Sequence, residues 1–126
     1  MSFDWTGLIR FSEAIKNSPP DNIDDEVVFR SIINRCYYGA FIYARNKAKY
    51  QIERSKRVHQ DVAKFYLYQA DPSLKKVGRN LETLFEYRKT ADYQDDWARE
   101  IAIENAVTKA LKCAKSIEGI LREKEI

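Results

Sequence analysis

Residues that break helices or build tight turns are scarce in this sequence, which has 4 glycines and 3 prolines among 126 residues. An all-β protein needs many tight turns and therefore more of both residues, so this scarcity argues against that class. Apolar runs are also short, and none approaches the roughly 20 residues that a membrane-spanning helix requires. Residues 1–16 include acidic side chains and lack the apolar stretch of a secretory signal. We therefore expect a cytoplasmic protein that does not contact a membrane.

Cysteine and histidine are rare as well. Cys36 and Cys113 lack the spacing of metal ligands, and we expect both to be buried free thiols, with a disulfide between them as the lesser alternative. His59 is the one histidine, which excludes any site that needs two imidazoles. The sequence also has no Gly-rich phosphate loop and no Glu-x-x-His pair. We therefore expect no bound metal ion and no cofactor.

The composition is that of a folded globular protein, with 44% hydrophobic, 33% charged and 13% aromatic residues. The length suits a single domain, residues 1–126, with one core. The net charge of +3 is a mild excess of positive charge. It permits weak affinity for anionic partners, but a dedicated duplex-DNA-binding protein usually carries a far denser basic stripe.

Apolar residues recur every three or four positions, which is the spacing of one face of an α-helix. The predicted helices cover residues 5–16, 25–49, 54 or 56 to 69, 73–90 and 97–124. Two prolines end the first, and Asp95 or Asp96 is expected to cap the last. In the third, the residues expected to face inward are Val58, Val62, Phe65 and Tyr66. The sequence thus predicts an all-α fold, a single bundle of four to five helices.

The end of the fourth predicted helix carries a charge in an unusual place. Its apolar stripe consists of Leu74, Val77, Leu81, Leu84 and Phe85. The next position in that series is Arg88. One interpretation is an ordinary helix end, where Arg88 complements the helix dipole while Asp92 and Tyr93 form the following turn. The other is a phosphate site, where the planar guanidinium of Arg88 binds the phosphate and Asp92 orients it or handles a proton.

The second predicted helix has an ordinary apolar face and an unusual back face. That back face carries Ser31, Asn34, Arg35, Tyr38, Ile42 and Arg45. A solvated face seldom combines Tyr38 and Ile42 with two arginines, so we expect a partner subunit or a ligand to cover part of it. Arg35 and Tyr38 can stack on and hydrogen-bond a nucleotide, although a packed helix whose arginines reach outward explains the same pattern.

His59 also has two interpretations. It shares a helix face with Val62, Ala63 and Tyr66, which favours an inward-facing histidine with a structural role. It is also the one side chain here that normally titrates near neutral pH, and therefore the one ready general acid or base.

Three motifs follow one another along nearly the whole chain. The first is Arg30-Ser31 with Tyr37-Tyr38-Gly39-Ala40-Phe41, the second is His59 in Val-His-Gln-Asp-Val, and the third is Arg-x-x-Ala-Asp-Tyr at residues 88–93. Together they make the chain resemble the HEPN superfamily, and in particular its small stand-alone prokaryotic branch.

The resemblance implies a four-to-five-helix bundle that is often a homodimer with its site at the subunit interface. It also implies kinship with metal-independent endoribonucleases that act as toxins in toxin–antitoxin or defence systems, often encoded beside a minimal nucleotidyltransferase. In active members an Arg-x4–6-His motif precedes the last helix; the arginine binds the scissile phosphate and the histidine helps the ribose 2′-hydroxyl attack it. Here Arg88 holds the place of the arginine, but no histidine follows it before the last predicted helix, and Asp92 stands near that place.

Two hypotheses about function follow. The first is a toxin-like protein that binds or cleaves RNA, with Arg88 on the phosphate and His59 or Asp92 assisting. The second is a non-catalytic helical dimer that binds a nucleotide or a partner protein such as a nucleotidyltransferase. The residues expected to bind phosphate or nucleotide are Arg88, Tyr93, Arg35 and Tyr38.

Overall fold

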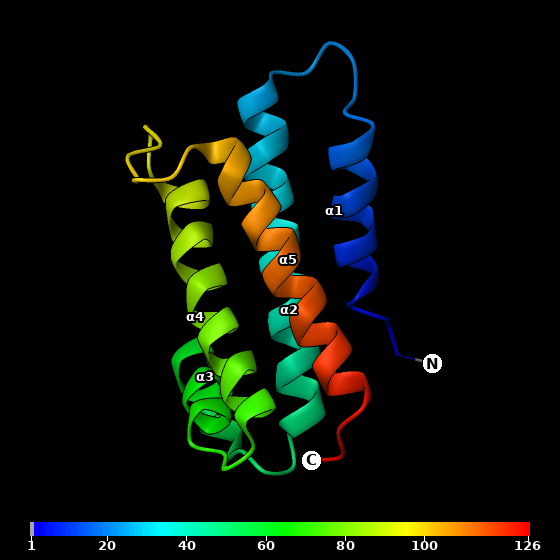
Figure 1. Ribbon diagram of the computed structural model, residues 1–126, viewed down its shortest axis with the longest axis vertical. Coiled ribbons are helices and arrows are strands. Elements are labelled where there is room, and N and C mark those ends of the chain that lie inside the picture. The colour runs from blue at the N-terminus through cyan, green and yellow to red at the C-terminus, as the bar shows by residue number, and fades with distance from the viewer. Residues whose placement is uncertain (1) are drawn as a thin grey trace.

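The computed structural model describes residues 2–126 and is all-helical, with 71% of the residues in helices and no strand in that range. Its elements are α1 (Gly7–Asn17), α2 (Asp25–Ala48), the short 3-10 helix η1 (Arg54–Lys56), α3 (His59–Leu67), α4 (Pro72–Tyr93) and α5 (Ile103–Arg122) (Figure 1). The prediction of an all-α bundle is confirmed.

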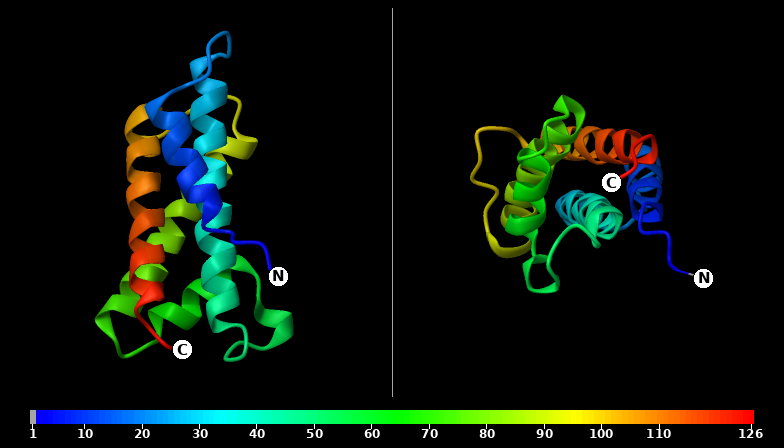
Figure 2. Two further views of the ribbon diagram at one scale, coloured as in Figure 1. Left: turned by 90° about the vertical axis from the view of Figure 1, so that its right-hand side faces the viewer. Right: turned by 90° about the horizontal axis from the view of Figure 1, so that it is seen from below.

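The long helix α2 is the centre of the bundle. It packs against α1, α4 and α5, which lie on three sides of it when the molecule is seen from below (Figure 2). Gly39 allows α1 to come close, because a Cβ at that position would lie 3.1 Å from both Ile9 Cγ1 and the Trp5 carbonyl oxygen. The short helix α3 packs on α4, on the side of the molecule away from α1 (Figure 1). This arrangement leaves one side of α2 uncovered by any helix.

The core lies between α2, α3, α4 and α5. Its fully enclosed side chains include Ile33, Val62, Tyr66, Val77, Leu81, Leu84, Ala110, Ile117 and Leu121. They recur at the helical spacing seen in the sequence, and burying each large apolar side chain contributes about 1.5–3 kcal/mol. The Tyr66 hydroxyl is satisfied by donating to the Ala44 carbonyl oxygen at 2.7 Å.

Helix α4 ends later than predicted. It continues to Tyr93 rather than stopping at residue 90, so Asp92 and Tyr93 belong to its last turn and the predicted turn at these residues is wrong. Arg30 of α2 provides the reason. Its guanidinium donates to the carbonyl oxygens of Ala91, Gln94 and Asp95 at 2.6–3.1 Å, groups that a helix end leaves without a partner.

Helix α5 begins later than predicted, at Ile103 instead of residue 97, and its N-cap is Ala102 rather than Asp95 or Asp96. The intervening residues form a loop. Trp97 lies over Tyr87 with ring centroids 6.4 Å apart, and its indole N–H donates to the Ile101 carbonyl oxygen at 2.8 Å. These contacts partly bury the indole and hold the loop in a non-helical path.

The third predicted helix is two elements, η1 and α3. Val58 was expected to face inward and is 59% exposed, so that prediction is wrong. It is the extended N-cap residue of α3 and therefore lies outside the helical period. Val62 and Tyr66 are buried, and Phe65 packs against the core as predicted.

The predicted free thiols are confirmed, since Cys36 and Cys113 are both buried and unbridged. Burial raises the pKa of Cys36 to about 12, so this thiol stays protonated at neutral pH. Across residues 2–126, the helices are all too short or too polar to cross a lipid bilayer.

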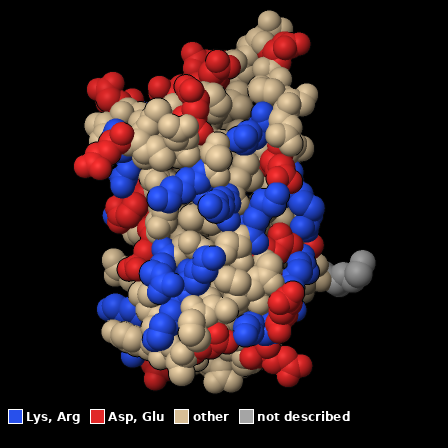
Figure 3. Space-filling view, viewed as in Figure 1, with Lys and Arg blue, Asp and Glu red and all other residues tan. Residues whose placement is uncertain are grey.

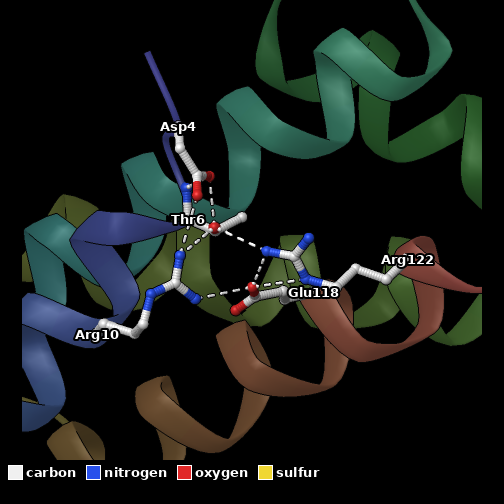
Figure 4. A network of polar contacts seen from close by, with 5 residues as sticks. All are labelled: Asp4, Thr6, Arg10, Glu118 and Arg122. Atoms are coloured by element: carbon white, nitrogen blue, oxygen red, sulfur yellow. Dashed lines mark hydrogen bonds and ion pairs between the residues drawn. The ribbon is translucent and has the colours of Figure 1, made fainter.

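A polar cluster joins the two ends of the chain (Figure 4). Glu118 of α5 accepts hydrogen bonds from Arg10 of α1 at 3.0 Å and from Arg122 at 2.5 Å. Both guanidiniums also donate to the hydroxyl of Thr6, whose side chain is fully buried, and that hydroxyl donates to Asp4 at 2.6 Å. The segment before α1 is thereby held against α5.

Candidate functional site

Arg88 lies in the last turns of α4, where the apolar stripe of this helix reaches α2. The preceding stripe positions Leu81 and Leu84 are fully buried, and the helical period brings Arg88 onto the same side. Its side chain is only 15% exposed. The sequence therefore predicted its orientation correctly.

Three tyrosine rings surround the guanidinium of Arg88. Its Cζ atom lies 5.3 Å from the ring centroids of Tyr37 and Tyr38 and 5.4 Å from that of Tyr93, within the range of cation–π attraction. Partial burial opposes the charge, but the nearby Tyr38 hydroxyl and the Asp92 carboxylate outweigh it and raise the pKa of Arg88. The guanidinium is therefore charged at neutral pH.

The nitrogens of Arg88 are used unequally. Nη2 donates to the Tyr38 hydroxyl at 2.7 Å and, more weakly, to the Tyr93 hydroxyl at 3.4 Å. Nε is buried and lies 2.9 Å from Asp92 Oδ2, which is close enough for an ion pair. Its N–H does not point at this oxygen, so the two atoms form no hydrogen bond. Nη1 is not buried and donates to no group within residues 2–126. One edge of the guanidinium is thus fixed, and the other is available to an acceptor from outside.

Asp92 connects Arg88 to the back face of α2. Both of its carboxylate oxygens accept from Asn34 Nδ2 at 3.1 Å, and Asn34 Oδ1 in turn accepts from Arg35 Nη1 at 2.8 Å. Asn34 and Tyr38 are one helical turn apart on α2, and Asp92 and Arg88 are one turn apart on α4. The two pairs face each other because α2 and α4 pack together.

A groove of about 430 Å³ runs between α2 and the end of α4. It is lined by Val27, Arg30, Ser31, Asn34, Arg35, Ala91 and Asp92. Asp92 forms the junction between this hollow and Arg88 with its tyrosines. We call the hollow together with Arg88, Tyr38 and Tyr93 the α2–α4 groove. Tyr93 is 69% exposed and offers a free aromatic face at its rim.

His59 begins α3 and is half-buried beside α4. Its ring stacks on Phe85 with centroids 3.8 Å apart, and its Nδ1 is 3.1 Å from the hydroxyl of Tyr37. Burial and then the charge of Arg88 lower the pKa of His59 to about 4. The imidazole is therefore neutral at pH 7, and Tyr37 is the link between it and Arg88.

A second hollow, of about 380 Å³, opens beside His59 between α3 and α4. Its charged lining residues are Lys64, Lys89, Glu82 and Glu86. His59 Nε2 is not buried and has no hydrogen-bond partner within the described chain. Nowhere in residues 2–126 do three His, Cys, Asp or Glu side chains come together as a metal site would require.

The structure brings the predicted site residues into one connected set. Arg88 contacts Asp92, Tyr38 and Tyr93 directly. Arg35 is reached through Asn34, and His59 through Tyr37.

Three members of this neighbourhood had no predicted role: Arg30, Asn34 and Tyr37. The sequence could have indicated Asn34, because Asn34 and Tyr38 have the same four-residue spacing as Arg88 and Asp92. Two such pairs on neighbouring helices can face each other. Nothing in the sequence pairs Arg30 with the end of α4, since about sixty positions separate them.

Comparisons with known proteins give no family to guide the interpretation of this site: no protein-family model, curated protein or solved structure matches the chain.

Proposed function

We propose that the α2–α4 groove binds the phosphate of a nucleotide or of a short stretch of RNA. The observation that carries this proposal is the state of Arg88, whose Nη2 edge is fixed by Tyr38 while Nη1 stays free and accessible. A guanidinium held in this way loses little conformational entropy when it binds an anion.

The surroundings of Arg88 fit a nucleotide better than an isolated anion. Tyr93 is an exposed ring beside the guanidinium, and stacking of a base on an aromatic side chain contributes about 1–3 kcal/mol. Arg35 is exposed further along the groove and supplies a second positive charge for a neighbouring phosphate. Asp92 is engaged by Arg88 and Asn34, so its charge is partly compensated.

Titration with AMP and with a trinucleotide, followed by NMR or calorimetry, tests this proposal. Arg88→Gln should weaken both ligands roughly tenfold to a hundredfold, because a hydrogen bond to a charged group contributes about 1.5–3 kcal/mol. Arg54→Gln is the matched control, since Arg54 lies in η1 and makes no ion pair within residues 2–126. Equal affinities of the wild type and Arg88→Gln would contradict the proposal.

Tyr93→Ala separates stacking from charge. It should weaken AMP binding while leaving the affinity for inorganic phosphate unchanged, because the ring contacts the base and not the anion. Equal loss of both ligands would instead mean that Tyr93 acts only by holding Arg88.

A metal-independent ribonuclease is the second candidate, and the neutral imidazole of His59 favours it. In such a reaction His59 Nε2 takes the proton of a ribose 2′-hydroxyl, and O2′ attacks the phosphorus held by Arg88. The P–O5′ bond then breaks to leave a 2′,3′-cyclic phosphate, and the departing 5′ oxygen takes a proton from water. The low pKa makes His59 a weak base, so binding is the better supported function.

Incubation with RNA in EDTA distinguishes the two candidates. Cleavage that is lost in both His59→Ala and Arg88→Ala supports the ribonuclease. If the wild type binds nucleotide but cleaves no RNA, the ribonuclease is excluded and the binding function is supported.

We further propose that the protein is a HEPN-type homodimer of a toxin–antitoxin or defence system, with a nucleotidyltransferase-type protein as a partner. The motifs at Arg30, His59 and Arg88 support this, and so does the side of α2 that no helix covers. Val27 is 55% exposed at the groove and offers an apolar contact there. Light scattering of the purified protein tests the dimer, and a monomer at micromolar concentration would contradict it.

A further inference from the structure

Helix α5 presents a basic face on the side away from the core. Its buried residues recur along one side, while Lys109, Lys112 and Lys115 follow one another at three-residue spacing on the other. In the space-filling view, Lys and Arg side chains gather over the middle of the face on which α5 lies, and acidic side chains are mostly peripheral (Figure 3). The net charge of +3 is therefore unevenly distributed over the surface.

A hollow of about 170 Å³ lies between α4 and α5. It is lined by Lys76, Asn80, Lys109, Lys112, Cys113 and Ser116. Burial raises the pKa of Cys113, and the positive charges of Lys109, Lys112 and Lys76 act against that rise. None of these lysines has a carboxylate partner within residues 2–126. Three lysines without a carboxylate partner thus line one small hollow.

Asn80 adds a second, independent feature to this hollow. Its Nδ2 atom is buried and has no hydrogen-bond partner within the described chain. A buried donor without an acceptor costs about 1–3 kcal/mol, so such groups usually serve a ligand or a water molecule. An anion among the three lysines would supply the missing acceptor, and Ser116 contributes a hydroxyl to the same lining.

The positive charge continues on both sides of the hollow. Lys109 also lines a hollow of about 550 Å³ that contains Arg99, and Lys112 also lines one of about 350 Å³ that contains Lys16 and Lys115. Their acidic members are Glu100 and Glu13, the latter paired with Lys115. None of the exposed large hydrophobic side chains lines any of the three hollows.

We propose that this α5 face binds the phosphate backbone of a nucleic acid, with one phosphate seated in the hollow between α4 and α5. A track of cations longer than one anion fits a polyanion whose charges repeat at regular intervals. Its lack of exposed aromatic and aliphatic side chains fits backbone contacts rather than stacked bases, and it offers no apolar anchor for a membrane surface. This face is separate from the α2–α4 groove, and the proposal does not depend on that groove.

Binding of a labelled 20-base-pair duplex at several salt concentrations tests the proposal. The triple variant Lys76→Gln/Lys109→Gln/Lys112→Gln should bind at least tenfold more weakly, and the slope of log affinity against log salt should fall by about 2 to 3, since each phosphate contact contributes about 0.9 to it. The control Lys47→Gln/Lys49→Gln/Lys56→Gln makes the same change of net charge at the end of α2, at its C-cap and in η1. Equal weakening by both triple variants would mean that only overall charge matters and would overturn the proposal.

Asn80→Ala distinguishes a built phosphate site from a diffuse positive surface. The variant should bind the duplex roughly tenfold to a hundredfold more weakly, because one hydrogen bond to a charged group is lost. Its thermal stability should stay equal or rise, because a buried donor without a partner is removed from a helix. Unchanged duplex affinity in Asn80→Ala would overturn the assignment of a phosphate to this hollow.

Three further measurements identify the source of the phosphate and distinguish binding at the α5 face from binding at the α2–α4 groove. Vesicles with phosphatidylserine should not bind, and binding to vesicles without binding to the duplex would overturn the proposal. Inorganic phosphate should compete only at millimolar concentration, because a single anion gains none of the flanking contacts; competition at micromolar concentration would contradict the backbone assignment. Arg88→Gln should retain duplex affinity within twofold, and the lysine variant should retain AMP affinity; the opposite pattern would assign the duplex to the α2–α4 groove instead.

Discussion

His59 stays neutral at physiological pH because it is half-buried and shares its surroundings with the positive charge of Arg88. Its sequence neighbourhood predicted an inward-facing ring and left open whether that ring takes part in chemistry. The structure shows an inward-facing ring with one nitrogen engaged and the other accessible. The ring is packed on Phe85, and Nδ1 is engaged by Tyr37, while Nε2 is the accessible nitrogen.

The first prediction concerns the pH dependence of stability. The folded state holds the His59 proton less tightly than the unfolded chain does, with a pKa of about 4 against about 6.5. Acidification therefore favours unfolding, and His59 alone should remove about 2 kcal/mol of stability between pH 7.5 and pH 5. Urea denaturation at both pH values measures this loss, and His59→Phe should show it no longer. An NMR titration giving His59 a pKa above 6 would contradict the prediction.

Arg30 completes the end of α4 from a different helix, which leads to the second prediction. Arg30→Met keeps the apolar stem but leaves the carbonyl oxygens of Ala91, Gln94 and Asp95 without a donor. The free energy of unfolding should fall by about 2 kcal/mol. Amide exchange in the last turn of α4 should accelerate, and AMP binding should weaken because Asp92 and Tyr93 lose their positions.

Arg45→Met is the control for Arg30→Met, because Arg45 also lies on α2 but bonds only the side chain of Asn46. Equal stability losses in these two variants would show that the contacts of Arg30 with α4 have no special importance.

At the scale of the helices, the pattern of apolar residues predicted the five α-helices and most of their inner faces, while η1 and the helix ends were harder to predict. The ends of α4 and α5 depend on Arg30 and on Trp97, whose partners lie elsewhere in the chain. The end of α3 depends on a glycine in another helix. Gly78 of α4 packs so close to α3 that a Cβ there would lie 2.7 Å from Leu67 Cγ and 2.9 Å from its backbone nitrogen.

The third prediction compares two helical glycines. Gly78→Ala should lower the free energy of unfolding by about 1–3 kcal/mol, because the overlap with Leu67 outweighs the better helix propensity of alanine. Gly119→Ala in α5 should raise it by about 0.5–1 kcal/mol, since a Cβ at that position meets nothing within 4 Å. Thermal or urea denaturation of both variants provides the test. Similar changes in both would mean that α3 does not pack tightly on α4.

At the scale of the whole molecule, charge is arranged in ways that the net value of +3 conceals. Unpaired lysines gather between α4 and α5, Arg88 is enclosed by tyrosines, and Glu118 is shared between two guanidiniums at the junction of the chain ends. Burial opposes the charge on Glu118, but hydrogen bonds from Arg122 and Arg10 outweigh it and lower its pKa.

The fourth prediction concerns this junction. Glu118→Gln should lower the free energy of unfolding at pH 7 by about 1–2 kcal/mol, because two arginines lose a largely enclosed partner. A carboxylate whose pKa is lowered in the folded state stabilises the fold only at pH values where it is ionised. The difference in unfolding free energy between Glu118→Gln and the wild type should therefore shrink as the pH falls toward 3. Glu13→Gln removes an exposed pair with Lys115 and should cost no more than about 0.5 kcal/mol. A constant difference between pH 7 and pH 3 would contradict the role of the ionised carboxylate.

The sequence alone determined the all-α class, the core stripes and the side of α4 on which Arg88 lies, because the helical period is a local property that each segment carries by itself. It did not determine which distant groups meet. The link from Arg88 through Tyr37 to His59, the support of α4 by Arg30, and the gathering of Lys76, Lys109 and Lys112 around Asn80 arise only when α2, α4 and α5 pack together. These contacts depend on how the helices pack, and packing results from many weak interactions along several helices together. No single segment of the sequence therefore determines them.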